Sequence, residues 1–250
     1  MTVWGLLSDI HGNLGQLERA VAECRARGAE RFVVLGDSLG RGDSDACVAL
    51  VRSLADVAVV GNRDLDWAAR VGAETRAYVL GLPRTARADD FVAVHGDARL
   101  DREVSSADIK GGFARTRSRL DCEGARVALF GHTHRARVWR LAADAEPVLL
   151  YDAASDARGA VLDITGRAGD RFVVNVGTVG LPFPGKGPSS CAVYDSTART
   201  VEIVPLGPTR PSDPAPRRGR ERGRPVAARS ATGAQSIANL TGAVTRSWSR

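Results

Sequence analysis

The chain has 250 residues, of which 44% are hydrophobic and 26% charged, a balance typical of a folded domain with one large core. No stretch approaches the roughly 18 consecutive apolar residues of a membrane span, and the N-terminus lacks the basic and apolar leader of a secretory signal. These features exclude a membrane protein and predict a cytoplasmic one. The net charge of +6 is uneven, because residues 207–250 hold nine arginines and two acidic residues and residues 1–206 are close to neutral.

The first half of the chain alternates short apolar runs with segments of helical apolar spacing. Asn13 is expected to cap the first helix and Gly28 to end it. This strand and helix alternation predicts a layered α/β fold with parallel strands. The predicted strands are residues 3–8, 31–35 and 57–60, and the predicted helices are residues 14–27 and 45–54.

Later in the chain, short β-rich runs follow one another between turn residues. Strands are predicted at residues 91–95 and 127–130, with a short helix at 112–120 between them. After His134 the runs predict a second, more antiparallel sheet that packs against the first. They comprise residues 136–141, 148–151, 159–164, 171–176, 191–195 and 200–205.

Residues 207–250 differ in composition from the rest of the chain. They are rich in Pro, Gly and Arg and nearly devoid of large apolar groups, so we expect a disordered tail after a folded domain of residues 1–206. Arginine could attract nucleic acid, and this tail is the only region that offers such a contact. Because its one aromatic residue is Trp248, stacking on bases is not indicated, and a solvated extension is the expectation.

All four histidines fall in motifs typical of metal ligands. Each motif follows a predicted strand, and loops at the carboxyl ends of strands in an open α/β sheet meet in one crevice. Oxygen and imidazole ligands without thiolate suit Mn, Fe, Zn, Co or Ni ions, and seven of them suit two ions ~3.5–4 Å apart. The motifs are Asp9-Ile10-His11, Gly36-Asp37, Gly61-Asn62-Arg63-Asp64, His95-Gly96 and Gly131-His132-Thr133-His134.

Each of these residues taken singly also has an ordinary structural explanation. Asp37 and Asn62 follow glycines and are common turn residues, and His95 could be a half-buried histidine at the end of a strand. His132 and His134 alternate on what is predicted to be an extended segment, so both side chains are expected to face the same way. Packing does not require that arrangement, and the set as a whole favours metal ligands.

The five motifs in this order resemble the calcineurin-like metallophosphoesterase superfamily over roughly residues 3–206, and residues 175–180 resemble its small bacterial phosphodiesterase branch. The resemblance implies a four-layer α/β/β/α sandwich of two mixed sheets flanked by helices. It also implies two divalent metal ions. The first would be held by Asp9, His11 and His134, the second by Asn62, His95 and His132, with Asp37 bridging them.

The same resemblance implies a reaction and its alternatives. The expected activity is hydrolysis of a small phosphodiester through attack by a metal-activated hydroxide. A phosphomonoesterase, acting on a nucleotide or a protein, is the alternative enzyme. A non-catalytic protein-interaction scaffold of the same fold is the alternative from another class.

Residue 63 departs from the family pattern, in which many members carry a histidine thought to protonate the leaving group or steady the phosphate. Arg63 keeps its proton and cannot be a general acid, but it can donate hydrogen bonds to a phosphate oxygen, or be a solvated surface charge. Asp64 either orients this guanidinium or caps the next turn. Together with Asp37 and Asn62, these two residues complete the candidate catalytic set. The missing histidine is expected to favour substrates with good leaving groups, or to leave a metal-bound water as the acid, and to favour phosphodiesters.

Three segments are expected to form loops that wall the pocket, at residues 65–78, 99–113 and 181–190. Residues 175–180 are expected to form a tight structural turn, with presentation of backbone N–H groups to a phosphate as the alternative. Lys186 is expected to belong to a linker.

Overall fold

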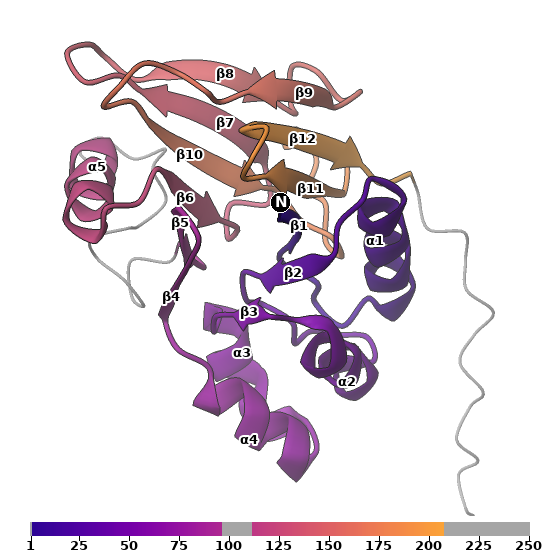
Figure 1. Cartoon of the computed structure of the whole chain (residues 1–250). Coiled ribbons are helices and arrows are strands. Elements are labelled where there is room, and N and C mark those ends of the chain that lie inside the picture. The colour runs from indigo at the N-terminus through magenta and orange to yellow at the C-terminus, as the bar shows by residue number, and fades with distance from the viewer. Residues whose placement is uncertain (1, 97–111, 208–250) are drawn as a thin grey trace, which may run out of the picture. The chain divides into compact units, whose positions relative to one another are not determined.

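The computed structural model describes residues 2–96 and 112–207 (Figure 1). The chain divides into a unit of residues 1–212 and another of residues 213–250, and all described residues belong to the first. The predicted tail lies outside the described residues except for Gly207, so its extent and any nucleic-acid contact stay predictions. No helix in the described part of the chain is long and apolar enough to cross a membrane.

Two six-stranded mixed sheets form the centre of this unit (Figure 1). In the first sheet, the three N-terminal strands are parallel, as the alternation of strands and helices predicted, and β11 runs antiparallel to β1. Its strands in spatial order are β3 (Val57–Ala58), β2 (Arg31–Val34), β1 (Val3–Leu7), β11 (Ser190–Asp195), β12 (Thr200–Pro205) and β9 (Ala160–Asp163).

The second sheet combines strands from the middle of the chain with three later ones. Because β10 pairs parallel with β6 and antiparallel with β7, the strands after His134 do not form a sheet of their own, and that prediction is wrong. An apolar alternation shows that a strand has a buried face, but not which strand pairs with it. The spatial order is β4 (Thr85–Ala88), β5 (Phe91–Val94), β6 (Val127–Phe130), β10 (Arg171–Val176), β7 (Ala136–Leu141) and β8 (Val148–Asp152).

Helices cover the outer faces of the two sheets. Helices α1 (Leu14–Ala26) and α2 (Ser44–Leu54) pack on the first sheet, whereas α5 (Gly112–Glu123) packs on β5 and β6 of the second (Figure 1). As predicted, the Asn13 side chain caps α1 by accepting a hydrogen bond from the Gln16 backbone. The four-layer α/β/β/α sandwich of two mixed sheets is therefore confirmed.

The segment after β3 is helical, which contradicts the loop predicted at residues 65–78. It contains α3 (Asn62–Trp67), one turn of 3₁₀ helix η1 (Ala68–Arg70) and α4 (Ala73–Gly81). These elements are short and bury few apolar side chains, so their sequence carries almost no helical periodicity. Helix α4 is held by contact with α2 rather than by a sheet.

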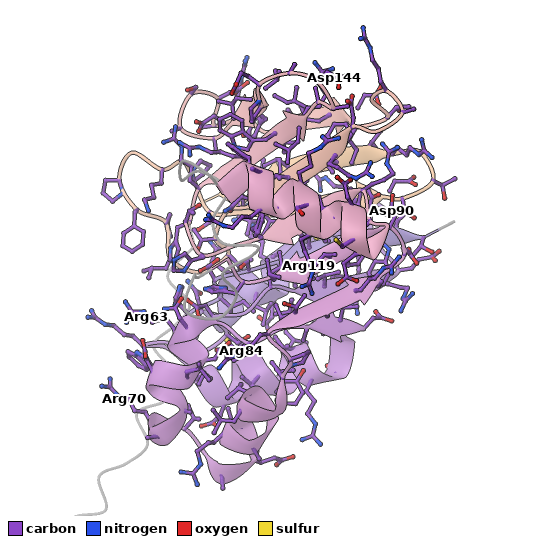
Figure 2. All side chains as sticks on the ribbon, turned by 90° about the vertical axis from the view of Figure 1, so that its left-hand side faces the viewer. Arg63, Arg70, Arg84, Asp90, Arg119 and Asp144 are labelled. Atoms are coloured by element: carbon purple, nitrogen blue, oxygen red, sulfur yellow. The ribbon has the colours of Figure 1, made fainter. Side chains whose placement is uncertain are left out.

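A large apolar core fills the space between the sheets. The indole of Trp4 from the first sheet meets the ring of Phe91 from the second edge-on, with centroids 5.2 Å apart. Polar atoms at the edge of this core are paired, as Tyr194 Oη donates to Asp90 Oδ1 at 2.7 Å (Asp90 is labelled in Figure 2). Such contacts fix one sheet against the other, and with them the loops at the strand ends.

Candidate metal centre

All seven predicted ligands lie beyond the carboxyl ends of strands, six in loops and Asn62 at the start of α3, and the structure brings them into one continuous cluster. Asp9 and His11 follow β1, Asp37 follows β2 and Asn62 follows β3. From the second sheet, His95 follows β5, while His132 and His134 follow β6. Both sheets thus contribute to the cluster, and the packing of one sheet on the other brings their residues together.

One half of the cluster consists of Asp9, His11 and His134. Oδ1 of Asp9 lies 3.1 Å from Nε2 of His134 and 3.7 Å from Nε2 of His11, and the two Nε2 atoms are 3.1 Å apart. Asp9 is fully buried and the histidine side chains are less than one-tenth exposed. Three ligand atoms thus converge on one point, in a group able to hold a metal ion.

The other half of the cluster is built around Asn62 and His95. Oδ1 of Asn62 lies 3.0 Å from Nε2 of His95 and 3.0 Å from Nδ1 of His132. Oδ2 of Asp37 lies 3.4 Å from Nε2 of His95 and 3.9 Å from Nε2 of His11, so this carboxylate stands between the two halves. Asp9, Asp37 and His95 form a second group able to hold a metal ion.

Hydrogen bonds to backbone carbonyls set the protonation of two of the histidines. Nδ1 of His95 lies 2.7 Å from the Leu35 carbonyl oxygen, and Nδ1 of His134 lies 2.6 Å from that of Leu181. A carbonyl oxygen only accepts, so we assign the proton to Nδ1 in both rings. In the neutral ring the lone pair is then on Nε2, which faces the cluster, and this is the tautomer that a metal ligand needs.

The cluster is strongly negative and attracts positive charge. Burial alone would lower the pKa of His95, but the charges of Asp37 and Asp9 and the Leu35 carbonyl raise it to about 9. For Asp9, burial raises the pKa, and the neighbouring imidazoles of His11 and His134 outweigh it and hold the pKa well below its usual value. Carboxylates at this depth require hydrogen-bond donors or a cationic partner.

The donors present fit divalent metal ions. Oδ1 of Asp9 is buried and accepts no hydrogen bond from the described residues, although its partner Oδ2 accepts from Ser8 Oγ at 2.7 Å and from the His132 backbone at 2.8 Å. A buried oxygen left in this way among imidazole nitrogens is what a bound cation would satisfy. Mixed oxygen and nitrogen donors without thiolate suit Mn²⁺, Zn²⁺ or a related ion.

The comparisons with known proteins agree with this geometry. A model of the calcineurin-like phosphoesterase superfamily domain matches residues 1–199. The chain belongs to the calcineurin-like phosphoesterase superfamily. The resemblance inferred from the five motifs is thereby confirmed.

Solved structures share the fold of this phosphoesterase. A metallophosphoesterase from Sphaerobacter thermophilus superposes with a TM-score of 0.65 at 24% identity, covering 82% of this chain and 89% of that one. The hypothetical protein PH1004 from Pyrococcus horikoshii OT3 gives a TM-score of 0.55 at 15% identity, covering 82% and 88%. Among curated proteins, the uncharacterized protein MJ0912 of Methanocaldococcus jannaschii is 40% identical over 60 residues, which span 24% of this chain and 25% of that relative.

Five of the seven predicted ligands of this phosphoesterase have a left-handed backbone, with φ between 52° and 65°. Non-glycine residues rarely adopt this region, and each instance costs roughly 1–2 kcal/mol. The prediction that residues 132–134 are extended, with both histidines facing the same way, is therefore wrong. His132 turns toward Asn62, and His134 turns toward Asp9. The five are Asp9, His11, Asp37, His132 and His134.

Asp64 lies beneath the ligands rather than among them. Its fully buried carboxylate accepts three backbone N–H groups, each at 2.9 Å. This arrangement favours the capping alternative over an interaction with the Arg63 guanidinium, and makes Asp64 a positioning residue for the loops that carry Asp37 and Asn62. The donors are the backbone N–H groups of Asp37, Leu39 and Gly61.

Arg63 contributes to the site first through its backbone. Its N–H group donates to Oδ1 of Asp37 at 2.7 Å, which orients that carboxylate. The guanidinium is about half exposed, and Nη1 lies 3.8 Å from Oδ2 of Asp66 (Arg63 is labelled in Figure 2). A catalytic role of the Arg63 side chain stays a prediction.

The sequence interpretation missed the residues that hold the histidine loop. Nδ2 of Asn175 donates to the Gly131 carbonyl at 2.7 Å and to Thr133 Oγ1 at 3.0 Å. Thr178 Oγ1 donates to the Asp9 carbonyl at 2.9 Å, and the Val179 and Gly180 N–H groups donate to the Ser8 and Asp9 carbonyls, so the part of this segment after β10 is a structural turn, as expected. The Asn and Thr of this glycine-rich turn were the available signal, but a local pattern does not show their distant partners.

Proposed function

We propose that this phosphoesterase hydrolyses phosphodiesters with two divalent metal ions. The observation that carries the proposal is the position of Asp37, whose Oδ2 lies 3.4 Å and 3.9 Å from histidine nitrogens on its two sides. A carboxylate placed between two buried groups of donors suits a bridge between two cations. A site for a single ion would not need donor groups on both sides of the Asp37 carboxylate.

The residues that would hold the two ions follow from this division. Bound divalent cations supply Lewis acidity toward phosphoryl oxygens and make water nucleophilic near neutral pH. Manganese is the first ion to test, since the carboxylate and amide oxygens of Asp9, Asp37 and Asn62 suit it. One ion would be held by Asp9, His11 and His134, the other by Asn62, His95 and His132, with Asp37 shared.

The preference for diesters is supported by the residue at position 63. An arginine gives up no proton at neutral pH, so the Arg63 side chain cannot protonate a departing alkoxide. Its exposed guanidinium can instead pair with a nonbridging phosphate oxygen. A diester carries one negative charge fewer than a monoester at neutral pH, and a good leaving group departs without a proton. Such a substrate suits a site in which the residue at position 63 can bind a phosphate oxygen but cannot donate a proton.

The test compares bis(p-nitrophenyl) phosphate with p-nitrophenyl phosphate in the presence of Mn²⁺. We expect the diester to have the higher kcat/KM, and rates across aryl diesters to fall steeply as the leaving-group pKa rises. A higher value for the monoester would replace the proposal with a phosphomonoesterase. Rates insensitive to leaving-group pKa would contradict the absence of a general acid.

Two substitutions sharpen this test. Arg63→His introduces a group that can donate a proton, so it should raise turnover of poor leaving groups by about tenfold or more, whereas Arg63→Ala should not. Asp37→Ala should abolish turnover and reduce the manganese content, with the exposed Asp144→Ala as the matched control (Figure 2 shows Asp144 far from Arg63). Purified protein that binds no metal and hydrolyses neither ester would favour the scaffold alternative.

A further inference from the structure

An exposed aromatic ring lies beside the metal centre. Of the aromatic residues that the structure describes, only Phe183 is classed as exposed, with 43% of its surface accessible. Its ring centroid is 4.8 Å from that of His134, and the two planes are tilted by 36°. Covering the exposed part of the ring would contribute up to about half of the roughly 1.5–3 kcal/mol that full burial of such a side chain provides.

The loop that carries Phe183 is anchored to the metal-ligand loops at several points. The Leu181 carbonyl accepts from Nδ1 of His134 at 2.6 Å, and the Gly180 N–H donates to the Asp9 carbonyl at 3.0 Å. Further along, Nζ of Lys186 donates to the Thr133 carbonyl at 2.8 Å. These contacts tie both sides of the ring to the backbone beside the cluster.

The loop is also stiff in itself. Proline residues flank Phe183 on both sides, and the Lys186 N–H donates to the Phe183 carbonyl at 3.1 Å to close a turn. Nζ of Lys186 lies 5.5 Å from the centroid of the Phe183 ring. The ring is therefore held in place before any ligand arrives, and a cation lies next to it. A pre-positioned aromatic face loses little entropy on binding.

We propose that Phe183 is the residue that selects for a flat aromatic ester group on the substrate, such as an aryl ring or a nucleobase. A phosphoryl group at the metal centre would lie next to the His134 imidazole, and a planar group on its ester oxygen would reach the exposed part of the Phe183 ring. Lys186 holds the loop and adds positive charge beside an anionic substrate. This inference rests on the proposed phosphoesterase function and narrows its substrate class.

Binding of three phosphonates, measured by titration calorimetry with the Mn²⁺-loaded full-length protein, tests the proposal. Phenylphosphonate should bind about tenfold more tightly than methylphosphonate, because ring stacking adds to apolar contact. Cyclohexylphosphonate, which is apolar but not flat, should fall between them. In Phe183→Leu the phenyl preference should drop to about twofold, whereas Phe183→Tyr should retain it. Leu80→Ala, an exposed apolar residue on α4, is the control and should change nothing.

Two results would overturn the inference. A phenyl preference unchanged in Phe183→Leu would show that the ring does not contact the ligand. Equal weakening of all three phosphonates, or a loss of manganese, would show that the ring only shields His134. Phosphonates are not hydrolysed, so a preserved aromatic preference without any diester turnover would refute the proposed reaction and leave this selectivity standing.

Discussion

Replacing Asp64 by Asn tests whether the fold positions the metal ligands through one buried carboxylate. Oδ2 of Asp64 accepts two N–H groups and Oδ1 accepts a third. An amide oxygen can retain the pair at Oδ2, but the amide nitrogen then faces the Leu39 N–H, donor against donor. One hydrogen bond to a charged group is lost and two become neutral, a loss of roughly 2–4 kcal/mol before any offset.

The buried charge itself opposes part of this loss. Burial and the neighbouring Asp37 charge raise the pKa of Asp64 to about 6, so the folded protein holds the ionised form at some expense. Removing the charge returns part of that free energy, and we expect Asp64→Asn to lower the free energy of unfolding by about 1–3 kcal/mol. Since the loops of Asp37 and Asn62 lose a shared anchor, the affinity for Mn²⁺ should also fall about 10–100-fold.

Urea unfolding followed by tryptophan fluorescence, and calorimetric titration with Mn²⁺, measure these two quantities. Asp66→Asn is the matched control, because Asp66 lies on the same helix, is about half exposed and has an ion-pair contact with Arg63 at 3.8 Å. It should change the free energy of unfolding by less than about 0.5 kcal/mol. If Asp64→Asn behaves like this control, the positioning argument is wrong. If turnover alone falls, Asp64 acts through the Arg63 guanidinium instead.

Two further predictions concern packing and pH. In Gly40→Ala the new Cβ would overlap the backbone of His11, which should lower the free energy of unfolding by about 1–3 kcal/mol. In Gly15→Ala on α1 the new Cβ meets nothing within 4 Å, which should raise it by about 0.5–1 kcal/mol. Urea unfolding measures both changes, and equal effects would contradict the argument. Burial acts to raise the pKa of Asp152, but hydrogen bonds and nearby positive charge, from Arg135 foremost, together outweigh burial and hold this pKa below its usual value. Asp152→Asn should therefore cost about 1 kcal/mol above pH ~4, a difference that vanishes as the pH falls through the lowered pKa; a pH-independent difference would refute it.

The clustering of the candidate ligands could be predicted because the requirements of a metal site are local and chemical. Asp9, Asp37 and His95 each stand within two residues of the end of an apolar run, and strand ends of an α/β fold converge whatever the exact pairing. The predicted convergence therefore holds even where the predicted pairing of strands is wrong. Although the later strands were assigned to one sheet and in fact divide between two, the cluster still forms, because β1, β2 and β3 are parallel in one sheet and β5 and β6 in the other.

The helical segment after β3 could not be predicted for the opposite reason. Helix α4 buries only Thr75 and Val79, so its apolar pattern is too sparse to indicate a helix. Its stability comes from tertiary packing, in which Val79 joins a small cluster with Val48 of α2 and Leu39 of the loop before it. A helix stabilised by tertiary contact leaves little trace in its own sequence.

The backbone of the histidine loop shows why local reasoning about orientation fails at such a site. An alternating His-Thr-His pattern predicts extended chain, yet both histidines are left-handed at a cost of roughly 1–2 kcal/mol each. The compensation comes from far along the chain, since Asn175 donates to Gly131 and Thr133 from more than 40 residues away. These hydrogen bonds of Asn175 stabilise the left-handed backbone of the two histidines, and secondary-structure propensity does not describe such contacts. The divergent directions of His132 and His134, which separate the two groups of donors, depend on those remote contacts rather than on the motif itself.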